Sequence, residues 1–137
     1  AGGGVRLLDF GLAKLIGIET LTQTGMVAGT PSYIGPEAWR GEKDLDHRID
    51  VYSLGVLVFR CLSGQVPYPT KSMIDLCRWA TSGERPSLCA LRPGLPPAID
   101  DWTRKALAID PQSRFQSVDS LWAALESIVS DGAASPY

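Results

Sequence analysis

The 137-residue chain is poor in the residue types and patterns that several functional classes require. It has one histidine, and its 13 lysines and arginines are outnumbered by 15 aspartates and glutamates, which gives a net charge of −2. This balance argues against a nucleic-acid binder with a broad basic surface. The longest apolar stretch, around residues 56–59, falls far short of the roughly 18 residues that a membrane span needs. We therefore expect neither a nucleic-acid partner nor a membrane span.

The three cysteines also argue against two kinds of site. Cys61, Cys77 and Cys89 are odd in number, and no two of them form a Cys-x-x-Cys pair. Structural zinc sites and disulfide frameworks need closer or paired spacing. The N-terminal residues lack the charged start and apolar middle of a signal peptide. We expect reduced thiols in or near the core of a cytoplasmic protein.

The chain does have the composition of a folded domain, with 45% hydrophobic and 20% charged residues. Apolar residues recur at helical spacing after Pro36. We expect one or two helical turns at 36–40 and longer helices at 47–62, 72–81, 98–109 and from Ser117 onward. Apolar side chains surround the 47–62 segment, which is typical of a buried helix, and Gly64 is placed to end it. A short buried strand is expected at 5–8.

The C-terminal third of the chain supports three further expectations. The Pro-rich segment 85–97 is expected to be irregular. The last helix has Ser117 as its N-cap, and the residues from Asp131 onward resemble a frayed end or a linker. The buried face of this helix is expected to comprise Val118, Leu121, Trp122, Leu125 and Ile128.

The segment 11–37 is the first place to expect chemistry, because it lacks periodicity and long loops inside compact domains are usually functional. Four short motifs stand in order: Asp9-Phe10-Gly11, residues 29–37 (GTPSYIGPE), residues 50–55 (DVYSLG) and residues 110–114 (DPQSR). An acidic residue before a turn is ordinary on its own. A carboxylate at a strand end, however, also suits a magnesium ion on nucleotide phosphates.

Together the four motifs resemble the C-terminal lobe of a eukaryotic-type (Hanks-type) Ser/Thr protein kinase. Residues 21–24 (LTQT) are similar to the activation loop of bacterial receptor-type Ser/Thr kinases. The resemblance covers residues 5–129, and it implies a mainly α fold with the activation segment on a helical bundle. We divide the chain into a kinase segment at 1–129 and a flexible tail or linker start at 130–137.

The resemblance implies ligand-binding and catalytic roles for residues near the N-terminus. Asp9 resembles the magnesium ligand of the D-F-G motif, and Phe10 and Gly11 complete this part of the ATP site. Thr30 matches the threonine that hydrogen-bonds near the catalytic aspartate of Ser/Thr kinases. Thr22 and Thr24 resemble phosphorylation sites of the activation loop, although ordinary loop threonines are the alternative.

Three further residues resemble structural positions of the family. Glu37 and Arg114 match the buried salt bridge that anchors the activation segment, and Asp50 matches the carboxylate that supports the catalytic loop. The sequence departs from the family pattern at Gly35, where alanine is usual, and at Tyr52, where tryptophan is more usual. The glycine is expected to loosen the local backbone.

Several family motifs do not occur in the sequence: the Gly-rich phosphate loop, the V-A-I-K lysine, the glutamate of helix C and H-R-D-x-x-x-x-N. His47 and Arg48 are followed by Ile49, so they do not form the catalytic loop, and His47 is expected to be exposed near a helix start. We expect the catalytic base and most of the nucleotide pocket to lie outside this chain. The helix at 47–62 is then expected to leave some apolar surface uncovered.

The function expected is part of a Ser/Thr kinase that uses ATP and Mg²⁺ on protein substrates, inactive without the missing parts. The alternative is a kinase-like binding module that docks partners through its helices. A pseudokinase is disfavoured because Asp9 is present.

Overall fold

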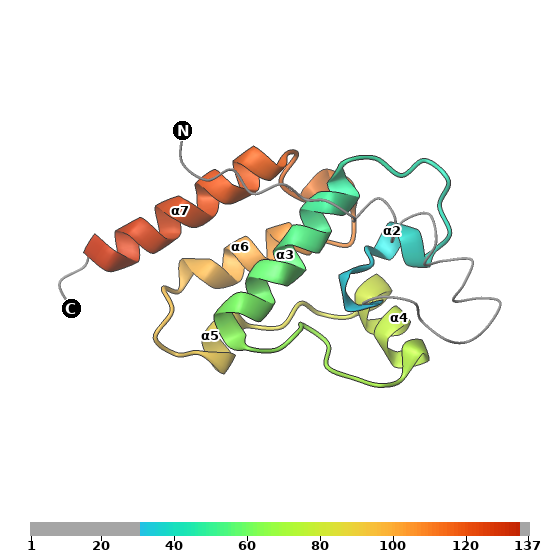
Figure 1. Ribbon diagram of the computed structural model, residues 1–137, viewed down its shortest axis with the longest axis horizontal. Coiled ribbons are helices and arrows are strands. Elements are labelled where there is room, and N and C mark those ends of the chain that lie inside the picture. Colours follow the sequence, from blue (N-terminus) through green and yellow to red (C-terminus); the bar gives the residue numbers. More distant parts are fainter. Residues whose placement is uncertain (1–30, 135–137) are drawn as a thin grey trace.

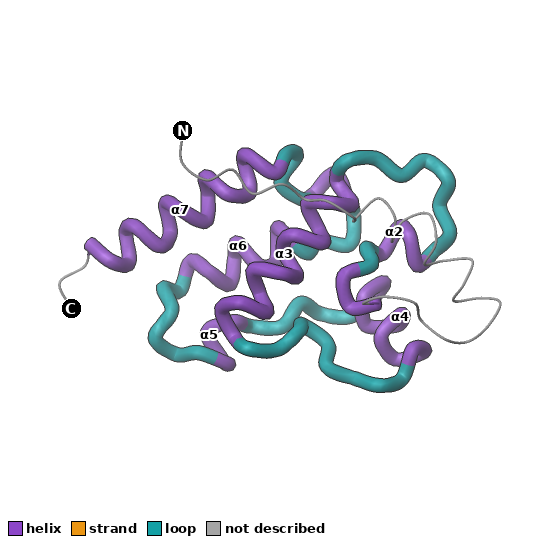
Figure 2. Tube along the Cα trace, viewed as in Figure 1, coloured by secondary structure: helices purple, strands orange, loops and turns teal. Residues whose placement is uncertain are grey.

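The computed structural model describes residues 31–134, and every regular element in this range is a helix (Figures 1 and 2). The elements are η1 (Pro31–Tyr33), α2 (Pro36–Trp39), α3 (Arg48–Ser63), α4 (Met73–Ser82), α5 (Leu88–Leu91), α6 (Ala98–Ala106), η2 (Pro111–Ser113) and α7 (Val118–Ala134). The mainly α expectation is confirmed. The strand expected at 5–8 lies outside the described residues.

Helix α3 is the centre of the fold, and the other elements are arranged around it (Figure 1). It contacts η1, α5, α6 and α7. Val51, Val56 and Phe59 have no exposed surface, so the prediction of a buried helix is confirmed. The expectation that this helix leaves some apolar surface uncovered is met only in part: Leu57 and Leu62 are half-buried, whereas the other large apolar residues of α3 are buried. Within the described part of the chain the large exposed apolar residues lie elsewhere, at Ile74, Leu91, Trp122 and Val129.

The glycines within α3 and directly after it have different structural roles. Gly64 follows the helix with a φ of +82° and donates its amide to the Arg60 carbonyl at 2.8 Å, so it ends the helix as predicted. Gly55 lies where α3 meets the end of α6. A Cβ at this position would lie 3.0 Å from both Ala106 Cβ and Leu107 Cδ2.

Gly55→Ala is therefore expected to destabilise the fold. The added methyl overpacks a closed contact, at a cost of about 1–3 kcal/mol, and the better helix propensity of alanine returns up to about 1 kcal/mol. We expect a net loss of about 1–2 kcal/mol in the free energy of unfolding, measured by urea denaturation. The double variant Gly55→Ala/Ala106→Gly returns the space and is expected to recover part of this loss. A single variant as stable as the original chain would contradict the close contact.

The structure differs from the sequence expectations in the C-terminal third. Segment 85–97 contains the one-turn helix α5, because Asp100 of α6 accepts hydrogen bonds from the Ser87 hydroxyl at 2.7 Å and the Cys89 amide at 3.1 Å. These bonds lower the pKa of Asp100 against the opposing effect of burial. Helix α6 ends at Ala106, three residues before the expected end.

Helix α7 differs from expectation in its buried face and in its length. Leu121 and Leu125 are buried and Val118 and Ile128 are half-buried, but Trp122 is 45% exposed. The expectation that Trp122 lies in the core is wrong, because α7 packs on α6 and α3 through the face that carries Leu121 and Leu125. The helix also continues to Ala134, so the frayed end expected from Asp131 is helical as far as that residue. No described helix is both long enough and apolar enough to cross a membrane.

Candidate functional site

The candidate site begins with Glu37 in the first turn of α2. Pro36 precedes it at the first helical position, where a missing N–H has no cost. The Glu37 side chain turns inward, and the residue is only 5% exposed. A Cβ at Gly35 would lie 2.8 Å from Glu37 Oε1, so a side chain at this position would require the carboxylate to shift. Its φ of −71° is ordinary, so the glycine leaves room for the carboxylate and does not serve an unusual backbone conformation.

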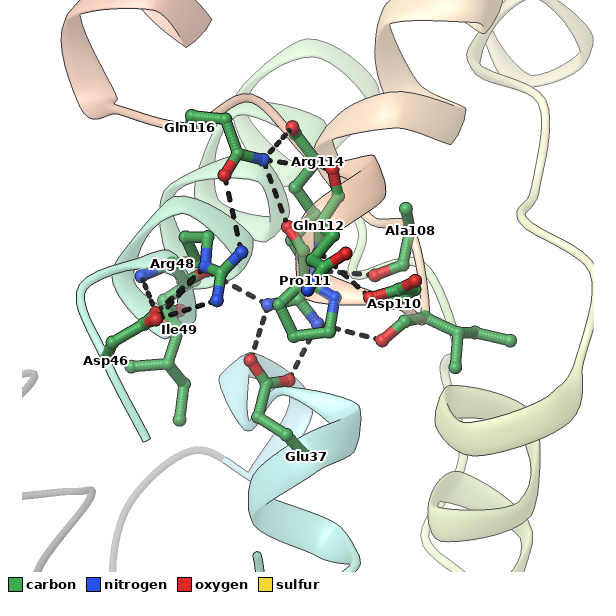
Figure 3. Close-up of polar contacts among 12 residues, drawn as sticks. Glu37, Asp46, Arg48, Ile49, Ala108, Asp110, Pro111, Gln112, Arg114 and Gln116 are labelled. Atoms are coloured by element: carbon green, nitrogen blue, oxygen red, sulfur yellow. Dashed lines mark hydrogen bonds and ion pairs between the residues drawn. The ribbon is translucent and has the colours of Figure 1, made fainter. Parts of the chain in front are cut away.

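Arg114 approaches Glu37 from the segment between η2 and α7, 77 positions later (Figure 3). Its Nη1 and Nη2 atoms donate to the two carboxylate oxygens of Glu37 at 2.6 and 2.7 Å. The remaining donors bond the carbonyls of Arg48, Ala108 and Ile109 at 3.0, 2.7 and 3.3 Å. A guanidinium has five N–H donors, and all five are used here. The contact expected between the second and fourth motifs is present.

Burial makes this ion pair different from a surface pair. The side chains of Arg114 and Glu37 are 0% and 6% exposed. Tyr52 of α3 lies beside the guanidinium, with the ring centre 5.0 Å from Arg114 Cζ, so the tyrosine retains an aromatic contact with the cation. Burial raises the pKa of Tyr52 to about 12. The pair therefore links α2, α3 and the segment before α7 in a low-dielectric environment, where bidentate geometry is most valuable.

A second, more exposed layer lies outside the pair (Figure 3). The Arg48 guanidinium donates to Asp46, with Nη2 2.8 Å from Oδ2, and this hydrogen bonding lowers the pKa of Asp46 to about 2. Arg48 Nη1 also donates to Gln116 Oε1 at 3.3 Å. His47 is exposed, as expected, but its Nε2 also donates to the Gln116 carbonyl at 2.6 Å. The start of α3 is thus joined to the segment that carries Arg114.

The structure tests only some of the residues selected from the sequence. Asp50 lies half-buried in the first turn of α3. The residues proposed for nucleotide, magnesium, catalysis and phosphorylation lie outside the described range: Asp9, Phe10, Gly11, Thr22, Thr24 and Thr30. No pattern in the sequence indicates the roles of Asp46, Arg48 and Gln116, because a single sequence carries no signal for side chains that bond backbone carbonyls and surface partners.

The described residues provide no alternative metal site. No group of three or more His, Cys, Asp or Glu side chains between residues 31 and 134 is arranged to hold a metal ion. Cys61, Cys77 and Cys89 are all free. Cys77 and Cys89 are half-buried, whereas Cys61 is exposed, so the expectation that all three thiols lie in or near the core is wrong for Cys61.

Comparisons with known proteins agree with the motif analysis. Residues 1–123 match the family model described as the protein kinase domain. The chain is 34% identical over 129 residues to serine/threonine-protein kinase PknL of Mycobacterium tuberculosis, an alignment covering 94% of this chain and 32% of PknL. It is 37% identical over 116 residues to PknD of the same organism, covering 84% and 17%. For PknH of Mycobacterium bovis the identity is 34% over 125 residues, covering 91% and 21%.

The chain thus spans about a third of the length of PknL and about a fifth of PknD and PknH. The family match includes the motif at residues 9–11 as well as both partners of the buried pair. The chain therefore belongs to the protein kinase domain family, with the helical arrangement of its C-terminal lobe and similarity to the eukaryotic-type Ser/Thr kinases.

Proposed function

We propose that this chain forms the activation segment and lower lobe of a Ser/Thr kinase that transfers the γ-phosphoryl group of ATP to protein substrates. The observation that carries the proposal is the buried bidentate pair between Glu37 and Arg114. The pair fastens the residues that directly follow segment 11–35 to the helical lobe. A segment held at its end by a buried anchor is suited to present catalytic and substrate-binding groups in a fixed geometry.

The residues near the N-terminus supply the proposed chemistry. Asp9 is the proposed magnesium ligand, with Phe10 and Gly11 beside it in the ATP site, and Mg²⁺ would neutralise charge on the phosphates. Thr30 is the proposed catalytic-site hydrogen-bonding residue. Asp50, at the start of α3, is proposed to support the catalytic loop of the intact kinase.

Thr22 and Thr24 are the proposed phosphorylation switch. One residue separates them, so an extended backbone would direct both side chains to the same face. A phosphate adds about −1.5 to −2 charges and three acceptor oxygens, which is enough to order a loop against a basic partner. The family's partner is the arginine of H-R-D, which this sequence does not contain.

We infer that the isolated chain transfers no phosphoryl group, since the catalytic base and the ATP-binding lysine of the family are not in its sequence. The kinase segment is proposed to span 1–129, with 130–137 as a tail or linker. A cytoplasmic location is inferred from the need for ATP. The alternative, a non-catalytic binding module, is favoured by one observation, the 80% exposure of Ile74 on α4.

The full-length protein that carries this segment tests the proposal. It is expected to label Ser/Thr acceptor peptides with radioactive phosphate from ATP and to leave a matched Tyr peptide unlabelled. Mass spectrometry of the active protein is expected to find phosphate on Thr22 or Thr24. A protein that binds partners but labels no acceptor would support the binding-module alternative.

A further inference from the structure

Gln116, two residues after Arg114, organises the turn that carries the arginine. Its Nε2 lies 2.7 Å from the Arg114 carbonyl, 3.1 Å from that of Gln112 and 3.2 Å from that of Pro111. The two hydrogens of the carboxamide are therefore directed at three carbonyls of one short turn, from η2 to Arg114. No other side chain bonds these three carbonyls among the described residues.

The opposite end of the carboxamide faces α3. Gln116 Oε1 accepts from Arg48 Nη1 at 3.3 Å, while the Arg48 carbonyl accepts from Arg114 Nη1 at 3.0 Å. Arg48 therefore touches both the carboxamide and the buried guanidinium (Figure 3). The orientation of the amide follows from these partners, because the reversed group would place its NH₂ against a guanidinium and its oxygen against three carbonyls.

We propose that Gln116 is a positioning residue for the buried pair. Its NH₂ group holds the turn from η2 to Arg114 through the three carbonyls, and its oxygen connects this turn to the start of α3 through Arg48. The Arg114 guanidinium is thereby positioned to meet Glu37 with all five donors satisfied. This inference goes beyond the proposed function, because it concerns how the pair is built and holds whether or not the protein transfers phosphate.

A simpler role for Gln116 makes the opposite prediction for one variant. Gln116 directly precedes Ser117, whose hydroxyl accepts the Ser120 amide at the start of α7. If Gln116 only flanked this helix, a negative charge there would be favourable or neutral, because anionic groups are stabilised near helix N-termini. If its NH₂ group positions the turn, Gln116→Glu places a carboxylate against three carbonyl oxygens. This variant is then expected to loosen the turn as Gln116→Ala does.

The test follows the Arg114 Nε–H signal in ¹⁵N NMR spectra of the 137-residue chain, assigned by its loss in Arg114→Lys. Its exchange with solvent is expressed relative to the Phe59 amide of α3, so that general destabilisation cancels. Gln116→Ala and Gln116→Glu are both expected to speed this relative exchange about threefold to tenfold, the effect of one lost hydrogen bond.

Gln112→Ala is the matched control. It removes an exposed side chain of the same type from the same turn, it retains the carbonyl, and that side chain makes no hydrogen bond with the described residues. Its relative exchange is expected to stay within about twofold of the original chain. The proposal is overturned if Gln116→Ala behaves like this control, or if Gln116→Glu slows the exchange.

Discussion

Glu37→Gln, which preserves the size of the side chain and removes its charge, is expected to lower the free energy of unfolding by about 3–5 kcal/mol. The Arg114 guanidinium would remain buried, with 0% of its side chain exposed and no counter-ion. The new amide group would also direct its NH₂ at one of the arginine donors. Desolvation of the unpaired guanidinium is therefore the main cause of the expected loss of stability.

Denaturant unfolding of the 137-residue chain measures this loss. The control is Arg78→Gln, which breaks the ion pair with Asp75 on the surface of α4, where the arginine side chain is 64% exposed. Exposed pairs contribute at most about 1 kcal/mol, so the control is expected to change stability little. Equal losses in Glu37→Gln and Arg78→Gln would mean that the buried pair does not hold α2 to the lobe.

Replacing both partners separates the charge from the hydrogen bonds. Glu37→Leu/Arg114→Leu leaves no buried charge, and apolar replacement of a whole buried pair is often neutral. Here only partial recovery is expected, because the carbonyls of Arg48, Ala108 and Ile109 also lose their donor. Each carbonyl left without a partner costs about 1–3 kcal/mol when it is buried.

The parts of the fold that the sequence predicted are those with a strong local signal. The apolar residues around α3 predicted its burial, and Gly64 predicted its end. Helix α5 was missed because one turn of helix in a Pro-rich segment has no periodicity, and the bonds to Asp100 that hold it come from another helix. Trp122 was misplaced because the apolar face of α7 is wider than the surface on which it packs.

The candidate site likewise contains residues that the sequence predicted and residues that it did not. Glu37 and Arg114 were paired through the motifs of a resembling family, since no periodicity connects residues 77 positions apart. The close approach of the Glu37 carboxylate to Gly35 could not be predicted, because it depends on how the Glu37 side chain turns in three dimensions. Gln116 carries no motif, and its partners are backbone carbonyls that every sequence contains.

Asp9→Ala in the full-length protein is expected to reduce phosphoryl transfer by about 10³-fold or more. Phosphoryl transfer depends on positioning and on neutralising the charge of the phosphates, and loss of a single group that does this typically costs several orders of magnitude in rate. Folding is not expected to change, because the proposed role of Asp9 is to bind an ion and not to pack the lobe.

Radiolabel transfer from ATP to a Ser/Thr peptide, compared between the full-length protein and its Asp9→Ala variant, is the most direct test that this chain carries the magnesium-binding part of a kinase. The 137-residue chain alone is the second arm, with its own Asp9→Ala variant as background. We predict transfer by the full-length protein, its loss in the Asp9→Ala variant, and no transfer above background by the chain alone. Undiminished transfer by a folded Asp9→Ala variant would contradict the assignment.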